Sequence, residues 1–168
     1  VPWCFAAALI HGVIVQATRK KWQITNLMLA GLPFLVFVYG TFLTRSGFLS
    51  EASVHSFAEM DRSALKLLIT LMGVTTLGFF GLWGVRAYQN RKTPTADVAE
   101  RSFSRDGFYM IGITLLLVMG FATMIGMSVP LVQAMRGMPP RVVEEAVYHQ
   151  VLSLIFVPLM RFMAVTPF

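Results

Sequence analysis

The chain has 168 residues, of which 56% are hydrophobic and 13% are charged, and its mean hydropathy is +0.67. A water-soluble domain carries about 25% charged residues, so this composition excludes a soluble globular protein and predicts an all-α polytopic integral membrane bundle. The net charge of +6 does not indicate nucleic-acid binding, because no basic and aromatic stripe or nucleic-acid motif accompanies it.

Five apolar segments follow one another and predict about five transmembrane helices in one domain. They lie approximately at 1–17, 23–45, 64–87, 107–135 and 148–168. The three middle segments reach the roughly 20 residues that a helix needs to cross a bilayer. The chain begins and ends inside apolar segments, so we expect a piece of a longer protein whose first and last helices are truncated.

Small residues and prolines recur inside these segments. Seven glycines are typical of helices that approach one another closely, and they are Gly31, Gly40, Gly73, Gly81, Gly112, Gly120 and Gly126. Internal prolines are tolerated in membrane helices. The single cysteine, Cys4, excludes an internal disulfide and any CxxC motif, and its apolar segment favours a packing role.

The basic residues predict the orientation of the segments. Three lie in the loop 18–22 and five lie in and beside the loop 88–106, whereas the opposite side carries four. Because cytoplasmic loops are enriched in Lys and Arg, both of these loops should be cytoplasmic. The loop 46–63 should then face the periplasm of a bacterium.

His11 lies within the first segment, about seven residues before the basic loop and therefore roughly 10 Å into the hydrocarbon. An ionisable group at such a depth indicates function. A neutral ring that hydrogen-bonds a neighbouring helix is the alternative. As a metal ligand, His11 would need a partner from another helix, and no second histidine inside these spans supplies it.

His55 lies in the periplasmic loop between apolar and serine neighbours. A neutral imidazole beside apolar groups suits the edge of a large flat ligand such as haem; a solvated loop histidine is equally compatible with the spacing. His149, the third histidine, begins the last segment, where an amphipathic ring is common at an interface.

Two arginines stand out. Arg45 ends the second segment, where its guanidinium could clamp carboxylates such as haem propionates or extend to the interface. Arg161 lies inside the last segment without an obvious acidic partner. No carboxylate pair within the spans, Ser/His/Asp set, P-loop or cysteine pair is present, so no catalytic residue is assigned and hydrolysis is unsupported.

Taken together, three stretches resemble the CcmF family of bacterial haem lyase components, which belongs to the CcmF/CycK/CcsA-like haem-handling proteins. Residues 1–12 (VPWCFAAALIHG), 40–47 (GTFLTRSG) and 53–58 (SVHSFA) match its motifs in order, and 157–160 (VPLM) matches more weakly. Two residues are added between Gly47 and His55 relative to the family pattern. The resembling region follows the family's tryptophan-rich WWD motif.

The resemblance implies two haem contacts. The family's counterpart of His11 is an axial ligand of a membrane-embedded b-type haem, and the counterpart of His55 holds haem delivered by the carrier CcmE. The implied partners are CcmE, thiol-handling and apocytochrome-handling proteins of the CcmH and CcmI type, apocytochrome c and membrane lipid. The implied location is the bacterial inner membrane.

The favoured hypothesis is therefore a haem lyase subunit that directs covalent haem attachment to CxxCH thiols of apocytochrome c. A membrane transporter or conduit for haem or another solute is the alternative, and it requires a polar path between helices. A structural scaffold without haem is the third possibility.

Overall fold

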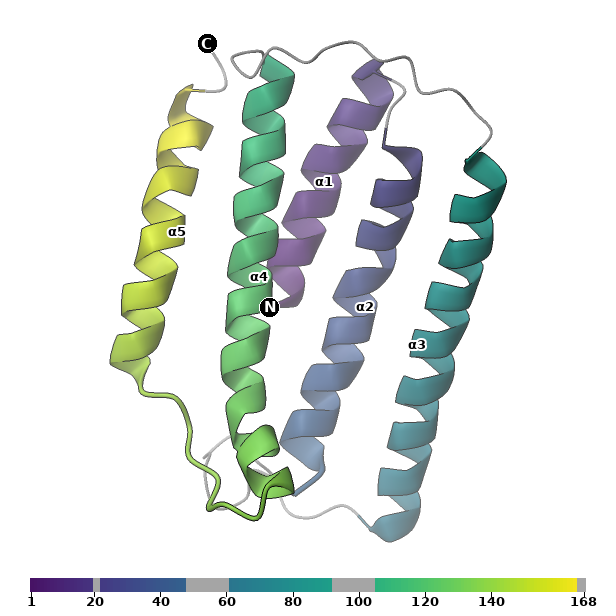
Figure 1. Cartoon of the computed structure of the whole chain (residues 1–168), viewed down its shortest axis with the longest axis vertical. Helices are drawn as coiled ribbons and strands as arrows, with labels where there is room; N and C mark the ends of the chain where they lie inside the picture. The colour runs from purple at the N-terminus through teal and green to yellow at the C-terminus, as the bar shows by residue number, and fades with distance from the viewer. Residues whose placement is uncertain (20–21, 48–60, 92–104, 166–168) are drawn as a thin grey trace.

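The computed structural model describes residues 1–19, 22–47, 61–91 and 105–165, and all regular structure in these ranges is α-helical. The predicted all-α bundle is thus confirmed. Its helices are α1 (Pro2–Arg19), α2 (Gln23–Arg45), α3 (Arg62–Asn90), α4 (Arg105–Met135) and α5 (Glu145–Val165). The short α1 packs against both α2 and α4, while α3 packs on α2 and α5 packs on α4 (Figure 1).

Four of the described helices are long and apolar enough to cross a membrane, and these are α2, α3, α4 and α5. The apolar part of α1, Pro2–Thr18, is shorter. Helices α2, α4 and α5 each continue through an internal proline, at Pro33, Pro130 and Pro158. The protein is therefore an integral membrane protein by the length and composition of its helices.

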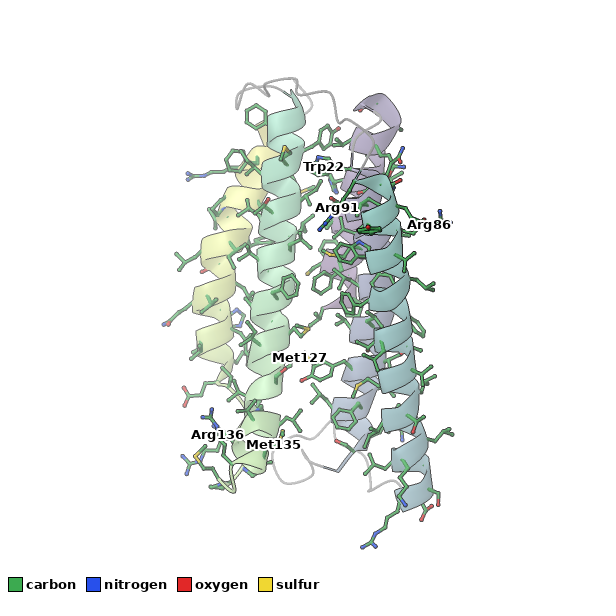
Figure 2. The ribbon with its side chains drawn as sticks, turned by 45° about the vertical axis from the view of Figure 1, so that its right-hand side comes forward. Trp22, Arg86, Arg91, Met127, Met135 and Arg136 are labelled. Atoms are coloured by element: carbon green, nitrogen blue, oxygen red, sulfur yellow. The ribbon has the colours of Figure 1, made fainter. Side chains whose placement is uncertain are left out.

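Successive helices run in opposite directions, so helix ends gather at two ends of the bundle. The end of α1, the end of α3 and the start of α4 share one end (Figure 1). Arg86 and Arg91 lie toward that end, and Arg136 lies at the other (Figure 2). This is the separation of basic segments on which the expected orientation depends.

Trp22 joins α1 to α2 in a conformation that is uncommon for residues other than glycine. Its φ of 72° and ψ of 19° lie in the left-handed region. Its carbonyl accepts the backbone N–H of Asn26 at 2.8 Å, and its ring packs against the hydrophobic core. The hydrogen bond and the packing of the ring together stabilise the strained conformation of Trp22.

The core lies where α1 meets α2 and α4. Phe5 of α1 and Leu29 of α2 are completely buried, and Leu116 of α4 lies against them in the same cluster. The Phe5 ring meets Phe121 edge-on, with centroids 5.1 Å apart. A Cβ at Gly120 would lie 3.1 Å from the Phe5 ring, so this glycine lets α1 and α4 pack closely.

The outer helix α3 is attached to α2 by aromatic side chains. The Phe79 ring occupies the space where Gly31 lacks a Cβ, and Trp83 donates its indole N–H to the Ile24 carbonyl at 3.0 Å. No residue of α3 is buried, and Leu77 is 76% exposed. Apolar exposure on this scale fits a helix surrounded by lipid.

The predicted role of the glycines in close packing holds for Gly31 and for two glycines of α4. Gly120 meets α1, and a Cβ at Gly126 would lie 2.6 Å from the Tyr148 hydroxyl of α5. The prediction is wrong within the described part of the chain for four others, because a Cβ would meet no atom within 4 Å at Gly40, Gly73, Gly81 or Gly112.

Replacing Gly31 with Ala should destabilise the α2–α3 pair by about 1–3 kcal/mol, because the new methyl group displaces the Phe79 ring. Unfolding in mixed detergent micelles, followed by helical circular dichroism, measures the effect. Gly40→Ala is the matched control, since it adds the same methyl group to the same helix in open space and should gain about 0.5–1 kcal/mol of helix propensity. Equal stability of the two variants would contradict the close contact.

Asp61 caps the start of α3. Its carboxylate accepts the Ser63 backbone N–H at 3.0 Å, and hydrogen bonds from Ser63 hold the pKa of this carboxyl below its usual value. A lowered pKa means that the carboxylate stabilises the fold above the unfolded-state pKa. That contribution is lost as the pH falls through the lower folded-state pKa.

Asp61→Ala should lower the amide-exchange protection of the first turn of α3 at neutral pH, because the cap is removed. In the unchanged protein the same protection should fall only in acid. Asp61→Asn retains a side-chain acceptor without titrating, so its protection should not depend on acid in this way. Amide exchange measured by mass spectrometry at several pH values tests this account. The same dependence of protection on pH in the unchanged protein and in Asp61→Asn would refute it.

Candidate functional site

His11 is half-buried on α1, and its ring is fixed by its own helix. Nδ1 lies 2.7 Å from the Ala7 carbonyl oxygen. A carbonyl can only accept a hydrogen bond, so Nδ1 must carry the proton. In the neutral imidazole, Nε2 therefore holds the free lone pair, which is the arrangement that a histidine uses as a metal ligand.

The surroundings of His11 are helical and partly aromatic. The Tyr109 ring of α4 lies 6.1 Å from the His11 ring, centroid to centroid, at 51°. Counting along α1, His11 lies roughly 12 Å before the helix end at Arg19. Among the described residues, no group of three His, Cys, Asp or Glu side chains could hold a metal ion. Within these described ranges, His11 can therefore supply one metal ligand, and no protein-only metal site forms around it.

Arg45 lies far from His11. It is the exposed last residue of α2, about 33 Å along the helix from Gln23, where α2 meets the end of α1. It precedes Ser46 and Gly47, whose φ of 76° turns the chain away from the helix. The structure thus places two of the predicted cofactor contacts, His11 and Arg45, toward different ends of the bundle.

Of the other two histidines, the structure describes His149 alone. His55 lies outside the described residues, so its role as a haem contact stays a prediction. His149 is 78% exposed near the start of α5, with Nε2 3.1 Å from a Glu145 carboxylate oxygen. An exposed pair of this kind stabilises a helix only slightly, which fits an interfacial residue.

Arg161 is exposed about one turn before the end of α5 at Val165. The structure therefore gives Arg161 an exposed position, and its role stays open.

A pocket of about 310 Å³ lies between α2 and α4, next to the first residues of α1. Its walls include Gly40, Thr41 and Thr44 from the GTFLTRSG motif, together with Met127 from the facing side of α4 (Figure 2). The pocket is mainly apolar. The motif therefore borders this space as well as the exposed Arg45 end.

The hydroxyl groups of Tyr39 and Ser128 form a hydrogen bond that links α2 to α4 beside the pocket. No sequence pattern indicated this pair. Ser128 donates to the Met124 carbonyl at 2.7 Å, so its oxygen is free to accept the Tyr39 hydroxyl at 2.6 Å. The two residues are 89 positions apart. No local pattern could have paired them.

Asn26 was also missed, although a signal was present. It is an amide inside an otherwise apolar segment, and it is the one polar side chain that is buried among the described residues, with 5% exposed. Its Nδ2 donates to the Gly12 carbonyl at 2.8 Å and to the Gln16 side-chain oxygen at 2.7 Å. Asn26 therefore ties α2 to the turn of α1 that follows His11.

Comparison with known proteins gives one consistent result. The chain is 30% identical over 167 residues to the cytochrome c-type biogenesis protein CcmF of Haemophilus influenzae, covering 99% of this chain and 25% of that relative. It is 27% identical to CcmF of Escherichia coli with the same coverage. It is 30% identical to CycK of Rhizobium meliloti over 169 residues, which is 23% of that relative.

No family model and no solved structure matches the chain. The chain spans about a quarter of the length of these curated relatives. The resemblance to the CcmF family is confirmed: over nearly its whole length, the chain is similar to part of the CcmF and CycK cytochrome c-type biogenesis proteins.

Proposed function

We propose that this protein acts in cytochrome c maturation, as a haem lyase component of the bacterial inner membrane. It receives haem from the carrier CcmE on the periplasmic side and presents it to the CxxCH thiols of apocytochrome c, with proteins of the CcmH and CcmI type handling the thiols. The names of the relatives support the process. The matches at 1–12, 40–47 and 53–58 support this particular step.

The observation that carries the proposal is the state of the His11 ring. With Nδ1 bonded to the Ala7 carbonyl, Nε2 is left as a neutral donor atom inside an apolar bundle. That donor fits a b-type haem, whose iron takes imidazole nitrogen as an axial ligand. The Ala7 carbonyl also sets the orientation of the ring.

Haem b bound at His11 would supply electron transfer that keeps the iron of the substrate haem reduced. The role of His11 is to bind and orient. The apolar helices around it exclude water, and a low-dielectric environment strengthens the electrostatic control of a bound group.

The periplasmic half of the proposal concerns a second, separate haem, which is the substrate. His55 would bind its iron, and Arg45 would pair with its propionates through charge-assisted hydrogen bonds. The exposed position of Arg45 at the end of α2 supports a periplasmic haem site separate from His11. The guanidinium directly precedes, in the sequence, the loop 46–63 that carries His55. Holding the haem at its iron and propionates leaves the vinyl edge open to the cysteine thiols.

A conduit function has less support. A polar solute or haem crossing the bundle needs polar groups along its path. Within the described part of the chain, Asn26 is the one buried polar side chain, and its Nδ2 donates to α1.

His55→Ala should abolish capture of haem from CcmE while leaving the b-type haem spectrum intact, because the two histidines serve separate haems. His11→Ala should give the converse, with loss of the b-type spectrum. Both variants should reduce the yield of holocytochrome c to a small fraction of the normal yield. Optical spectra of the full chain purified from membranes, with haem-stained cytochrome c, measure the three effects.

His149→Ala is the matched control, since it removes an exposed histidine whose ring nitrogen lies beside the Glu145 carboxylate of the same helix. It should leave both spectra and the cytochrome yield unchanged. A normal cytochrome yield in His55→Ala would rule out the periplasmic haem contact. A normal b-type spectrum in His11→Ala would rule out the membrane ligand.

A further inference from the structure

The amide of Asn26 fits its site in one orientation. Its two N–H groups meet two acceptors, the Gly12 carbonyl and the Gln16 side-chain oxygen. Turning the amide over would place its oxygen against both acceptor oxygens, and its two N–H groups would lose these hydrogen bonds. Asn26 thus donates twice across the α1–α2 interface.

Gly12 makes this approach possible. Asn26 Oδ1 lies against Gly12 so closely that a Cβ on Gly12 would collide with it, and Oδ1 has no hydrogen-bond partner in the structure. A buried amide oxygen without a partner carries a desolvation cost. The two donated bonds and the close fit against Gly12 offset that cost, and they hold this turn of α1 at a single distance from α2.

His11 precedes Gly12, and its ring depends on the position of this turn. The ring is hydrogen-bonded to the Ala7 carbonyl of the same helix, so it moves with α1 as a unit. The direction of Nε2 within the bundle is therefore set by how α1 is held, and Asn26 is the buried polar group that holds it. Tyr109 of α4 limits the ring on another side.

We propose that Asn26 is a positioning residue for His11. It fixes the His11–Gln16 turn of α1 against α2 and so fixes where Nε2 points. This inference rests on the proposed function of His11 as a haem ligand. Asn26 bonds to Gly12 and Gln16 of α1 and not to the His11 ring, so it would orient the ligand nitrogen through the position of α1.

The test is Asn26→Leu in the full chain purified from membranes, with the b-type haem itself as the probe. Leu retains the branched shape of the side chain but donates no hydrogen bond to α1. The variant should lose haem about tenfold faster to a competing haem acceptor. Its low-spin ferric EPR spectrum should show shifted g-values, since these report the orientation of the axial imidazole. Thr25→Val, an exposed polar-to-apolar change on the same turn of α2, is the control and should behave as the unchanged protein.

Gly12→Ala gives a second route if Asn26→Leu does not accumulate. Its methyl group collides with the Asn26 amide, so it should shift the same EPR features with Asn26 still present. Gly112→Ala is its control, because a Cβ at Gly112 meets no atom within 4 Å.

The outcomes separate this inference from the function on which it rests. If His11→Ala retains the b-type spectrum, the ligand role fails and the positioning role fails with it. If His11→Ala loses that spectrum while Asn26→Leu or Gly12→Ala keeps both the EPR g-values and the rate of haem loss, only the positioning role of Asn26 is overturned.

Discussion

The arrangement depends on the close packing of α1 in the groove between α2 and α4. Apolar packing alone does not draw helices together in lipid, because the lipid chains are as apolar as the side chains. What fixes α1 is therefore shape and hydrogen bonding. Gly120 admits the Phe5 ring on one side, and Gly12 admits the Asn26 amide on the other. The outer helix α3 then packs on α2, and α5 packs on α4 and adds Leu159 to the same buried cluster.

This packing gives His11 its chemical character. A histidine on a loosely held helix could turn either ring nitrogen toward a ligand. In this structure the ring is bonded to its own backbone, and the backbone is held by α2 and α4. The free nitrogen is thus presented in a fixed direction, and such preorganisation is what a ligand site requires. The proposed periplasmic contacts form a separate region, since the antiparallel course of α2 carries Arg45 to the far end of the bundle.

Much of this fold could be predicted from the amino-acid sequence, because hydrophobic length sets the helices of a membrane protein. The helix predicted at 23–45 matches α2, and α5 begins three residues before its predicted start at residue 148. His11 was identified from its depth in an apolar segment. Its tautomer could not be predicted, since it depends on the geometry of a bond to a carbonyl four residues away. The Asn26 contacts were also beyond prediction, because they depend on which face of α2 meets Gly12.

The central claim is that His11 is held with Nδ1 protonated and Nε2 free. The most direct measurement is nitrogen NMR of the haem-free full chain in micelles, with ¹⁵N-labelled histidine and with His11 assigned by its loss in His11→Ala. The account predicts that Nδ1 of His11 gives the signal of a protonated ring nitrogen and that Nε2 gives the signal of an unprotonated one. A protonated Nε2 with an unprotonated Nδ1 would contradict it.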